Sequence, residues 1–352
     1  MTSNSIVHTI PKARNLTVKE LNEYDHILVM FSGGKDSVAC HLNLLQLGVD
    51  QSKIELWHHD IDGREGERLF DWAITRDYCQ KYAEAFNVPI YFSWLEGGFE
   101  REMTRNNQKK SRTWFEVPND DGDVYLHSAG GTRGKEATRM KFPQIGADLS
   151  TRWCSAYLKI DVATAAIINQ ERFQNTKTLV ITGERGEESA NRARYEMFEP
   201  DRSDNRNGKR VVRIVDHWRP IRDWKEGRVW AIMAEYKVNP HPAYRLGFGR
   251  CSCLFCIFGN ADQFETARFI SPLQGAKLAE LEDKFSEFHG KRVTMKRKDS
   301  LHDLYAKGQV YEATKQNPKL VQLANSETFD EPIILNNWTL PNGAYSESCG
   351  PT

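Results

Sequence analysis

The 352 residues are 39% hydrophobic and 27% charged, a composition typical of a globular protein that buries a sizeable core in one large or two modest domains. The 48 basic and 48 acidic residues cancel, which excludes a global electrostatic field that attracts nucleic acid. No apolar run approaches the roughly 20 residues that span a bilayer, and the N-terminus lacks the layout of a signal peptide. We therefore expect a cytoplasmic protein with no membrane partner, whose seven cysteines are thiols or metal ligands.

The first predicted strand, residues 27–31, is a short apolar run that stops at a glycine turn before an amphipathic helix. Such a strand, turn and helix form an anion site, because glycine lets the backbone approach a phosphate and the first N–H groups of the helix point at it. The lysine adds a positive charge and the serines add hydroxyl donors. The spacing differs from Walker A, which has four residues between a glycine and Gly-Lys. This phosphate loop consists of Ser32, Gly33, Gly34, Lys35, Asp36 and Ser37.

Predicted strands and helices alternate beyond the phosphate loop. Residues 53–57 read as a second strand that leads to Asp60. Residues 65–86 have apolar positions at helical spacing, and residues 89–94 form a third short strand.

Residues 96–149 interrupt this alternation. They are rich in Gly, Lys, Arg and Asn with little periodicity, so we expect an insertion or a lid over the site. The alternation resumes with a helix over residues 150–170 and a strand over residues 178–182 that stops at Gly183. This pattern predicts an α/β fold with a mostly parallel, doubly wound sheet.

Ligands of such sheets bind beyond the carboxyl ends of the strands. The phosphate loop, Asp60 and residues 183–185 all follow predicted strands, so we expect them in one site. We divide the chain into an N-terminal extension (1–24), a nucleotide-binding α/β domain (25–258) and a helical, then irregular, C-terminal region (259–352).

The cysteine distribution is the second strong feature. Cys251, Cys253 and Cys256 form a compact thiol segment, and Cys154 stands apart near a predicted helix start. Four thiolates are soft ligands that suit an iron–sulfur cluster or zinc. Apolar neighbours would shield a cluster from water, so we predict a four-iron, four-sulfur cluster, with a structural zinc ion as the alternative. Small buried apolar residues without a metal are the third interpretation.

The six residues of the phosphate loop resemble the loop of the PP-loop ATP pyrophosphatase superfamily. Further motifs, in the same order along the chain, resemble its phosphoadenosine phosphosulfate (PAPS) reductase-like branch. These motifs are Arg152-Trp153-Cys154 with Leu158-Lys159, Gly183-Glu184-Arg185 with Glu188-Ser189 and Arg192, Pro220 to Trp224 with Val229-Trp230, His241 to Tyr244 with Gly247, and Cys253-x-x-Cys256. The resemblance implies an adenine nucleotide alpha-hydrolase-like fold with a helical C-terminal extension.

The resemblance also implies roles for single residues. The phosphate loop would bind nucleotide phosphates, and Asp60 would hold the nucleotide or a metal ion. Beside Gly183, the guanidinium groups of Arg185 and Arg192 would meet an anionic substrate or phosphate, with Glu188 orienting one of them. The residues that we assign to catalysis are Lys35, Asp36 and Arg185.

True PAPS reductases, as the resemblance is usually understood, lack the intact loop. We therefore predict an ATP-dependent adenylating enzyme that converts ATP with Mg²⁺ to AMP and pyrophosphate and activates an acceptor for sulfur transfer. Relatives that join this loop to such cysteines act in DNA phosphorothioation and tRNA thiolation, which favours DNA or tRNA as the acceptor and leaves a small molecule as the alternative. A cysteine desulfurase is the expected sulfur donor.

Two alternatives remain open from the sequence. The first is an oxidoreductase that reduces PAPS or its unphosphorylated analogue, with Cys349 as the nucleophile. The second is a nucleotide-sensing subunit of a nucleic-acid-modifying complex, supported by basic stretches at residues 101–112, 202–213 and 291–298.

Overall fold

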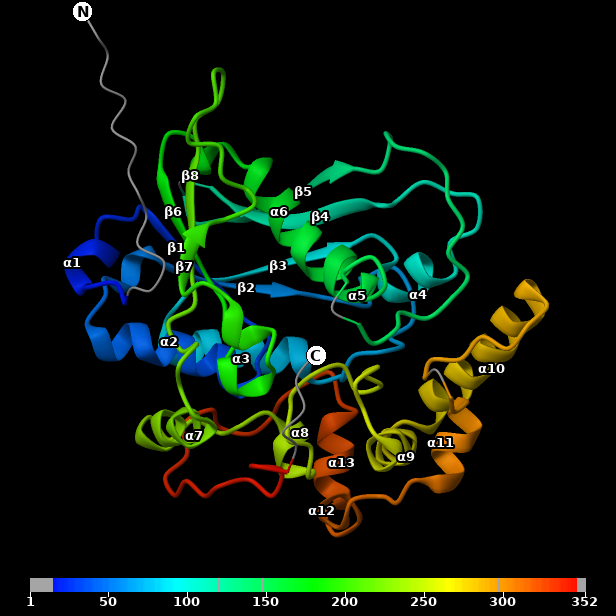
Figure 1. Cartoon of the computed structure of the whole chain (residues 1–352). Helices are drawn as coiled ribbons and strands as arrows, with labels where there is room; N and C mark the ends of the chain where they lie inside the picture. Colours follow the sequence, from blue (N-terminus) through cyan, green and yellow to red (C-terminus); the bar gives the residue numbers. More distant parts are fainter. Residues whose placement is uncertain (1–14, 120, 147, 297, 347–352) are drawn as a thin grey trace, which may run out of the picture.

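A single mixed sheet organises the computed structural model, which describes residues 15–119, 121–146, 148–296 and 298–346 (Figure 1). The eight strands of this described part lie in the order β5-β4-β3-β2-β1-β6-β8-β7. Their bounds are β1 (His26–Met30), β2 (Ile54–His59), β3 (Ile90–Leu95), β4 (Arg112–Pro118), β5 (Val124–Gly130), β6 (Lys177–Ile181), β7 (Phe198–Pro200) and β8 (Ile214–Trp218).

The five central strands are parallel, and the antiparallel pairs lie at the two edges. Strand β1 pairs with β2 on one side, where Ile27 lies opposite Ile54, and with β6 on the other, where Ile27 lies opposite Leu179. These residues are fully buried, as expected for parallel strands that are covered on both faces. The predicted α/β class and mostly parallel, doubly wound sheet are confirmed.

Helices cover both faces of this sheet (Figure 1). Helices α2 and α3 contact β1, β2 and β3, whereas α6 contacts β3 and β4 from the other face. The bounds are α1 (Val18–Leu21), α2 (Lys35–Leu47), α3 (Thr75–Phe86), α4 (Gly98–Met103), α5 (Trp153–Ser155), α6 (Asp161–Ile168), α7 (Glu226–Glu235), α8 (Pro242–Arg245), α9 (Ala261–Ile270), α10 (Pro272–His289), α11 (Leu301–Lys307), α12 (Glu312–Lys315) and α13 (Pro318–Ala324).

The strand order reverses at β1. The chain runs from β1 through β2 to β3 in one direction and later returns to place β6 and β8 on the other side of β1. In open α/β sheets, such a switch point opens a crevice at the carboxyl ends of the two strands. The phosphate loop follows β1 and Gly183 follows β6, so both predicted elements border this crevice.

Two local predictions differ from the structure. The helix predicted over residues 65–86 begins only at Thr75, because one carboxylate oxygen of Asp62 accepts the backbone N–H groups of Leu69, Phe70 and Asp71 and holds an irregular loop. The stretch 96–149, expected to be an insertion or a lid with little periodicity, contributes α4, β4 and β5, and the last two strands extend the sheet.

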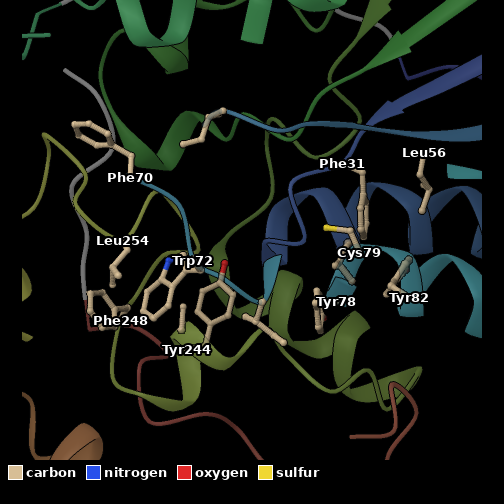
Figure 2. Packing of buried hydrophobic residues seen from close by; sticks show 14 of the residues in the cluster. Phe31, Leu56, Phe70, Trp72, Tyr78, Cys79, Tyr82, Tyr244, Phe248 and Leu254 are labelled. Atoms are coloured by element: carbon tan, nitrogen blue, oxygen red, sulfur yellow. The ribbon is translucent and has the colours of Figure 1, made fainter. Parts of the chain in front are cut away.

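The C-terminal region is helical from α9 to α13 and then irregular, as predicted. It forms a further layer beyond α2 and α3 (Figure 1). Helix α7, which precedes this region in the chain, packs directly on α2. Figure 2 shows how the core continues between these layers, from Phe31 and Tyr82 to Tyr244, Trp72 and Phe248. In the described part of the chain, no helix is both long and apolar enough to cross a membrane. The domain boundaries stay a prediction.

Asp62→Ala should lower the free energy of unfolding by about 3 kcal/mol, because three buried N–H groups lose their acceptor. Denaturant unfolding would measure this. Asp121→Ala, at an exposed aspartate, is the control and should change the value by less than about 0.5 kcal/mol. Equal effects of the two substitutions would contradict the role given to Asp62.

Candidate functional site

A cavity of about 780 Å³ opens beyond the carboxyl ends of the parallel strands. Ser32 from the phosphate loop, His58 from β2 and His217 from β8 line its walls, and Cys253 lies across from the sheet on the later cysteine segment. Trp57 belongs to an apolar part of the lining on the α6 face of the sheet. The size is in the range of small-molecule and cofactor sites.

The phosphate loop has a preformed turn. Gly33 has φ +73°, and a Cβ there would lie 3.0 Å from the Cys79 sulfur, so both conformation and space require glycine. Within the loop, the Ser37 hydroxyl donates to the Gly34 carbonyl at 2.9 Å. The N–H groups in the first turn of α2 have no carbonyl partner within the helix. The Lys35 N–H donates to the Tyr244 hydroxyl at 2.9 Å, and the other N–H groups of this turn are the donors that a phosphate needs.

Lys35 does not reach into this cavity. Its side chain is 3% exposed, and its ammonium donates to the Gly249 carbonyl at 3.0 Å. The same ammonium lies 5.4 Å from the ring centre of Tyr244 and 5.9 Å from that of Trp230. In this structure, Lys35 therefore ties the phosphate loop to the chain that precedes Cys251.

Asp36 and Arg185 join the ends of β1 and β6. The Arg185 Nε donates to Asp36 Oδ1 at 2.6 Å. Burial raises the pKa of Asp36, but Lys35 and Arg185 outweigh burial and hold the pKa below its usual value, so the carboxylate stays ionised. Gly183 lies directly on this turn, since a Cβ there would be 3.0 Å from the backbone of Asp36. Within the described part of the chain, this pair lies behind the cavity wall.

Arg192 is the predicted basic residue that lines the cavity. An ion pair with Glu188 holds its guanidinium group, which agrees with the orienting role predicted for Glu188. Arg192 is thus the charged donor of this segment that a bound anion can contact directly.

The carboxylate of Asp60 has a cationic partner, the guanidinium group of Arg64. Its Oδ2 accepts Arg64 Nε at 2.8 Å, and its Oδ1 lies 3.6 Å from His58 Nε2. His58 Nδ1 must donate to the Phe31 carbonyl, 2.8 Å away, because a carbonyl only accepts. Burial lowers the pKa of His58, so Nε2 of the neutral ring carries a lone pair. No described residue bonds to this atom, which is available to a donor group of a ligand in the cavity.

The four predicted metal-ligating residues line this same cavity: Cys154, Cys251, Cys253 and Cys256. Burial raises the pKa of Cys154 to about 11, and the pKa of Cys253 is raised well above its usual value. Among the described residues, however, no three His, Cys, Asp or Glu side chains are arranged to hold a metal ion. The donor type suits a soft metal, but the ligand set is not closed around a centre in this structure.

Lys159 and Asp71 join the thiols on the cavity wall. Burial lowers the pKa of the Lys159 ammonium, but Cys253 and Cys154 outweigh this effect and raise the pKa. Burial and the nearby Asp62 raise the pKa of Asp71 to about 7. The thiol end of the cavity therefore holds the Lys159 cation and, in Asp71, a carboxyl group whose pKa of about 7 lets it gain or lose a proton near neutral pH.

A hydrogen-bonded chain lines the wall of the cavity that β6 and β8 contribute. The Arg219 guanidinium donates to His217 Nδ1 at 3.4 Å, and His217 Nε2 then donates to the Thr182 hydroxyl at 2.6 Å. The Thr182 hydroxyl bonds in turn to Glu184. All four residues of this chain line the cavity: Thr182, Glu184, His217 and Arg219.

Residues 131–258 match the family described as the phosphoadenosine phosphosulfate reductase domain. This match confirms the resemblance predicted from the motifs. It includes Cys154, residues 183–192 and residues 249–256, whereas the phosphate loop and Asp60 precede it.

The chain is also similar to the "Uncharacterized 37.8 kDa protein in gpa 5'region" of Escherichia phage 186. The two are 30% identical over 142 residues, which are 40% of this chain and 39% of the relative. The chain thus spans about two fifths of the length of that relative.

Two solved structures are similar in part. They are complexes of Candida glabrata FMN adenylyltransferase, one with FMN and an ATP analogue and one with FAD and inorganic pyrophosphate. Both are 11% identical in sequence to this chain. The first has a TM-score of 0.31 and covers 65% of this chain and 55% of its own. The second has a TM-score of 0.30 and covers 64% of this chain and 54% of its own.

Sequence reasoning missed His58, Asp71, Lys159 and His217 as residues that line this cavity. A signal existed for His58, which ends a strand two residues before Asp60, and for Lys159, which follows the Cys154 motif. Asp71 and His217 had no signal, because only the fold of the loop that carries Asp71 and the pairing of β8 with β6 bring them to the cavity. His241, which begins one of the motifs quoted above, is fully buried and caps α8 by accepting the Ala243 N–H. Cys349 lies outside the described residues.

Gly183→Ala should weaken nucleotide binding by about tenfold, because the new methyl group would push the β6 turn away from the Asp36 backbone. Titration with ATP and Mg²⁺ would measure this. Gly66→Ala is a matched control, since nothing lies within 4 Å of its added Cβ. Unchanged affinity in Gly183→Ala would show that the two strand ends do not form the nucleotide site.

Proposed function

We propose that the chain is a nucleotide-utilising enzyme of the PP-loop superfamily that splits ATP into AMP and pyrophosphate to adenylate an acceptor. The observation that carries this proposal is the intact phosphate loop at the switch point of the sheet, bordering a cavity of about 780 Å³. A Gly-rich turn with Lys and Ser at a helix N-terminus is suited to polyphosphate. The match to the PAPS reductase domain supports adenine nucleotide chemistry in this fold.

In the proposed reaction, an acceptor oxygen attacks the α-phosphorus of ATP while the bond to pyrophosphate breaks. The N–H groups of the first turn of α2 hold the leaving pyrophosphate, and Arg192 offers a guanidinium group to its oxygens. Asp36 and Arg185 keep the loop in place from behind. Mg²⁺ bound with ATP would neutralise phosphate charge.

The finer proposal is that the adenylated acceptor then receives sulfur. A sulfur nucleophile would form the new bond to the acceptor while AMP leaves with the former acceptor oxygen. Support comes from the thiols that share the cavity with the phosphate loop. DNA or tRNA as acceptor and a cysteine desulfurase as sulfur donor belong to this proposal.

The PAPS or APS reductase remains the second candidate, because the matched domain carries that name. The two candidates differ in their products. Adenylation releases pyrophosphate from ATP, whereas reduction of PAPS releases sulfite and leaves ATP intact.

Arg192→Gln should reduce pyrophosphate release from ATP by about 100-fold, since removal of one charged donor to a transition state costs about that much. Release would be measured with Mg²⁺ and with DNA or tRNA as acceptor. Arg194→Gln is the control, because Arg194 is exposed and lies two residues away. Pyrophosphate release that survives in Arg192→Gln would refute the assigned role. Sulfite formation from PAPS without ATP cleavage by the unsubstituted protein would favour the reductase.

The proposed iron–sulfur cluster is tested independently of ATP. Anaerobically purified protein should contain iron and acid-labile sulfide, and Cys253→Ser should lose both, because the thiolate would be a ligand. Cys40→Ala is the control, since Cys40 is fully buried on α2. Stoichiometric zinc would support the alternative metal, and unchanged iron in Cys253→Ser would exclude this ligand set.

A further inference from the structure

Strand β5 is an open edge of the sheet. It is the last strand in the order, and among the described residues no strand pairs with its outer side (Figure 1). Its residues pair with β4 in unbroken register, from Arg112 opposite Gly130 to Pro118 opposite Val124. Since alternate residues of an antiparallel strand direct their backbone groups to opposite sides, the outer side of β5 carries a row of N–H and C=O groups that can pair with another strand.

This edge lacks the features that usually keep an edge strand from pairing. Strand β5 contains no Asp, Glu, Lys, Arg or Pro and has no bulge. The large hydrophobic side chains of Val124, Tyr125 and Leu126 are 50%, 53% and 48% exposed. The opposite edge differs, because β7 has only three residues, and two of them are Glu199 and Pro200. An edge that is neither short nor charged is therefore found at β5 and not at β7.

The sequence of β5 fits a second copy of itself. Its first half carries large side chains, and its second half carries small ones. When two copies of β5 pair antiparallel with all seven residues matched, a two-fold axis passes through His127. Each large residue at the start of one copy then lies opposite a small residue at the end of the other: Val124 opposite Gly130, Tyr125 opposite Ala129 and Leu126 opposite Ser128.

The charges that flank β5 fit the same arrangement. The charged residues nearest to its start include Asp121 and Asp123, the next ones after its end are Arg133 and Lys135, and all four are exposed. Antiparallel pairing brings the acidic end of one copy to the basic end of the other, with Asp121 matched to Arg133, and the two-fold axis repeats this contact. The 48 acidic and 48 basic residues of the chain cancel, so no net charge opposes the association of two copies.

We propose that two copies of this chain pair through β5 around a two-fold axis at His127, so that two eight-stranded sheets become one continuous sheet. Backbone hydrogen bonds across the axis hold the two strands together. Tyr125 and Leu126 lose exposed apolar surface, which adds to the stability of the pair. No residue of β5 lines the cavity, so this interface is separate from the site and does not rest on the proposed function.

Sedimentation equilibrium of the full chain tests the pairing. The unsubstituted protein should form dimers with a dissociation constant of about 10 µM, as expected for a small interface. His127→Glu places two carboxylates opposite each other at the axis and should weaken dimerisation about tenfold. His127→Gln is the matched control, because it changes the same exposed residue without adding a charge, and it should leave the dissociation constant within about twofold.

The flanking charges provide a second test, which depends on the register. Arg133→Asp should weaken dimerisation about threefold, and adding Asp121→Arg to the same chain should restore it, because opposite charges then face each other again. A chain that stays monomeric at about 100 µM overturns the proposal, as does a dimer that His127→Glu leaves unchanged or weakens no more than His127→Gln. Failure of the double variant to recover dimerisation would overturn the register centred on His127.

Discussion

The phosphate loop is held from two sides, and the rest of the site depends on this constraint. The groups that hold the loop leave Ser32 on the cavity wall. On one side, Gly183 touches the Asp36 backbone and Arg185 bonds the Asp36 carboxylate. On the other side, Lys35 holds the Gly249 carbonyl. The Lys35 N–H is taken by the Tyr244 hydroxyl, so the other N–H groups in the first turn of α2 are left for an anion.

The cavity places two kinds of chemistry side by side. Near the phosphate loop, Arg192 and backbone donors suit a polyphosphate. At the thiol end, burial keeps the cysteines protonated by raising their pKa, while Lys159 supplies a cation among them. Binding of a metal there would have to displace protons from thiols, which makes metal loading dependent on pH. The two ends therefore line one cavity, as the proposed activation and transfer steps require.

Helices and strands that are determined by residues close together in the sequence were predicted correctly, whereas those that depend on distant residues were not. Strands β1, β2, β3 and β6 and helix α2 were predictable, because their apolar residues alternate or repeat within the element itself. Residues 65–74 were wrongly predicted as helix, since the buried carboxylate of Asp62 captures their N–H groups. The strands of the 96–149 stretch were missed for a similar reason: β5 is largely exposed at the sheet edge, so its pairing with β4 is not written in a periodic apolar pattern.

By itself, the amino-acid sequence determined the fold class, the phosphate loop and the set of thiols, because glycine turns, periodic apolar residues and clustered cysteines act over a few residues. Only the tertiary structure decided where the side chains point. It turned Lys35 away from the cavity, paired Asp36 with Arg185 and brought His58 and His217 to the cavity wall. The physical reason is that these orientations depend on burial and on partners far along the chain, and neither is encoded in local spacing.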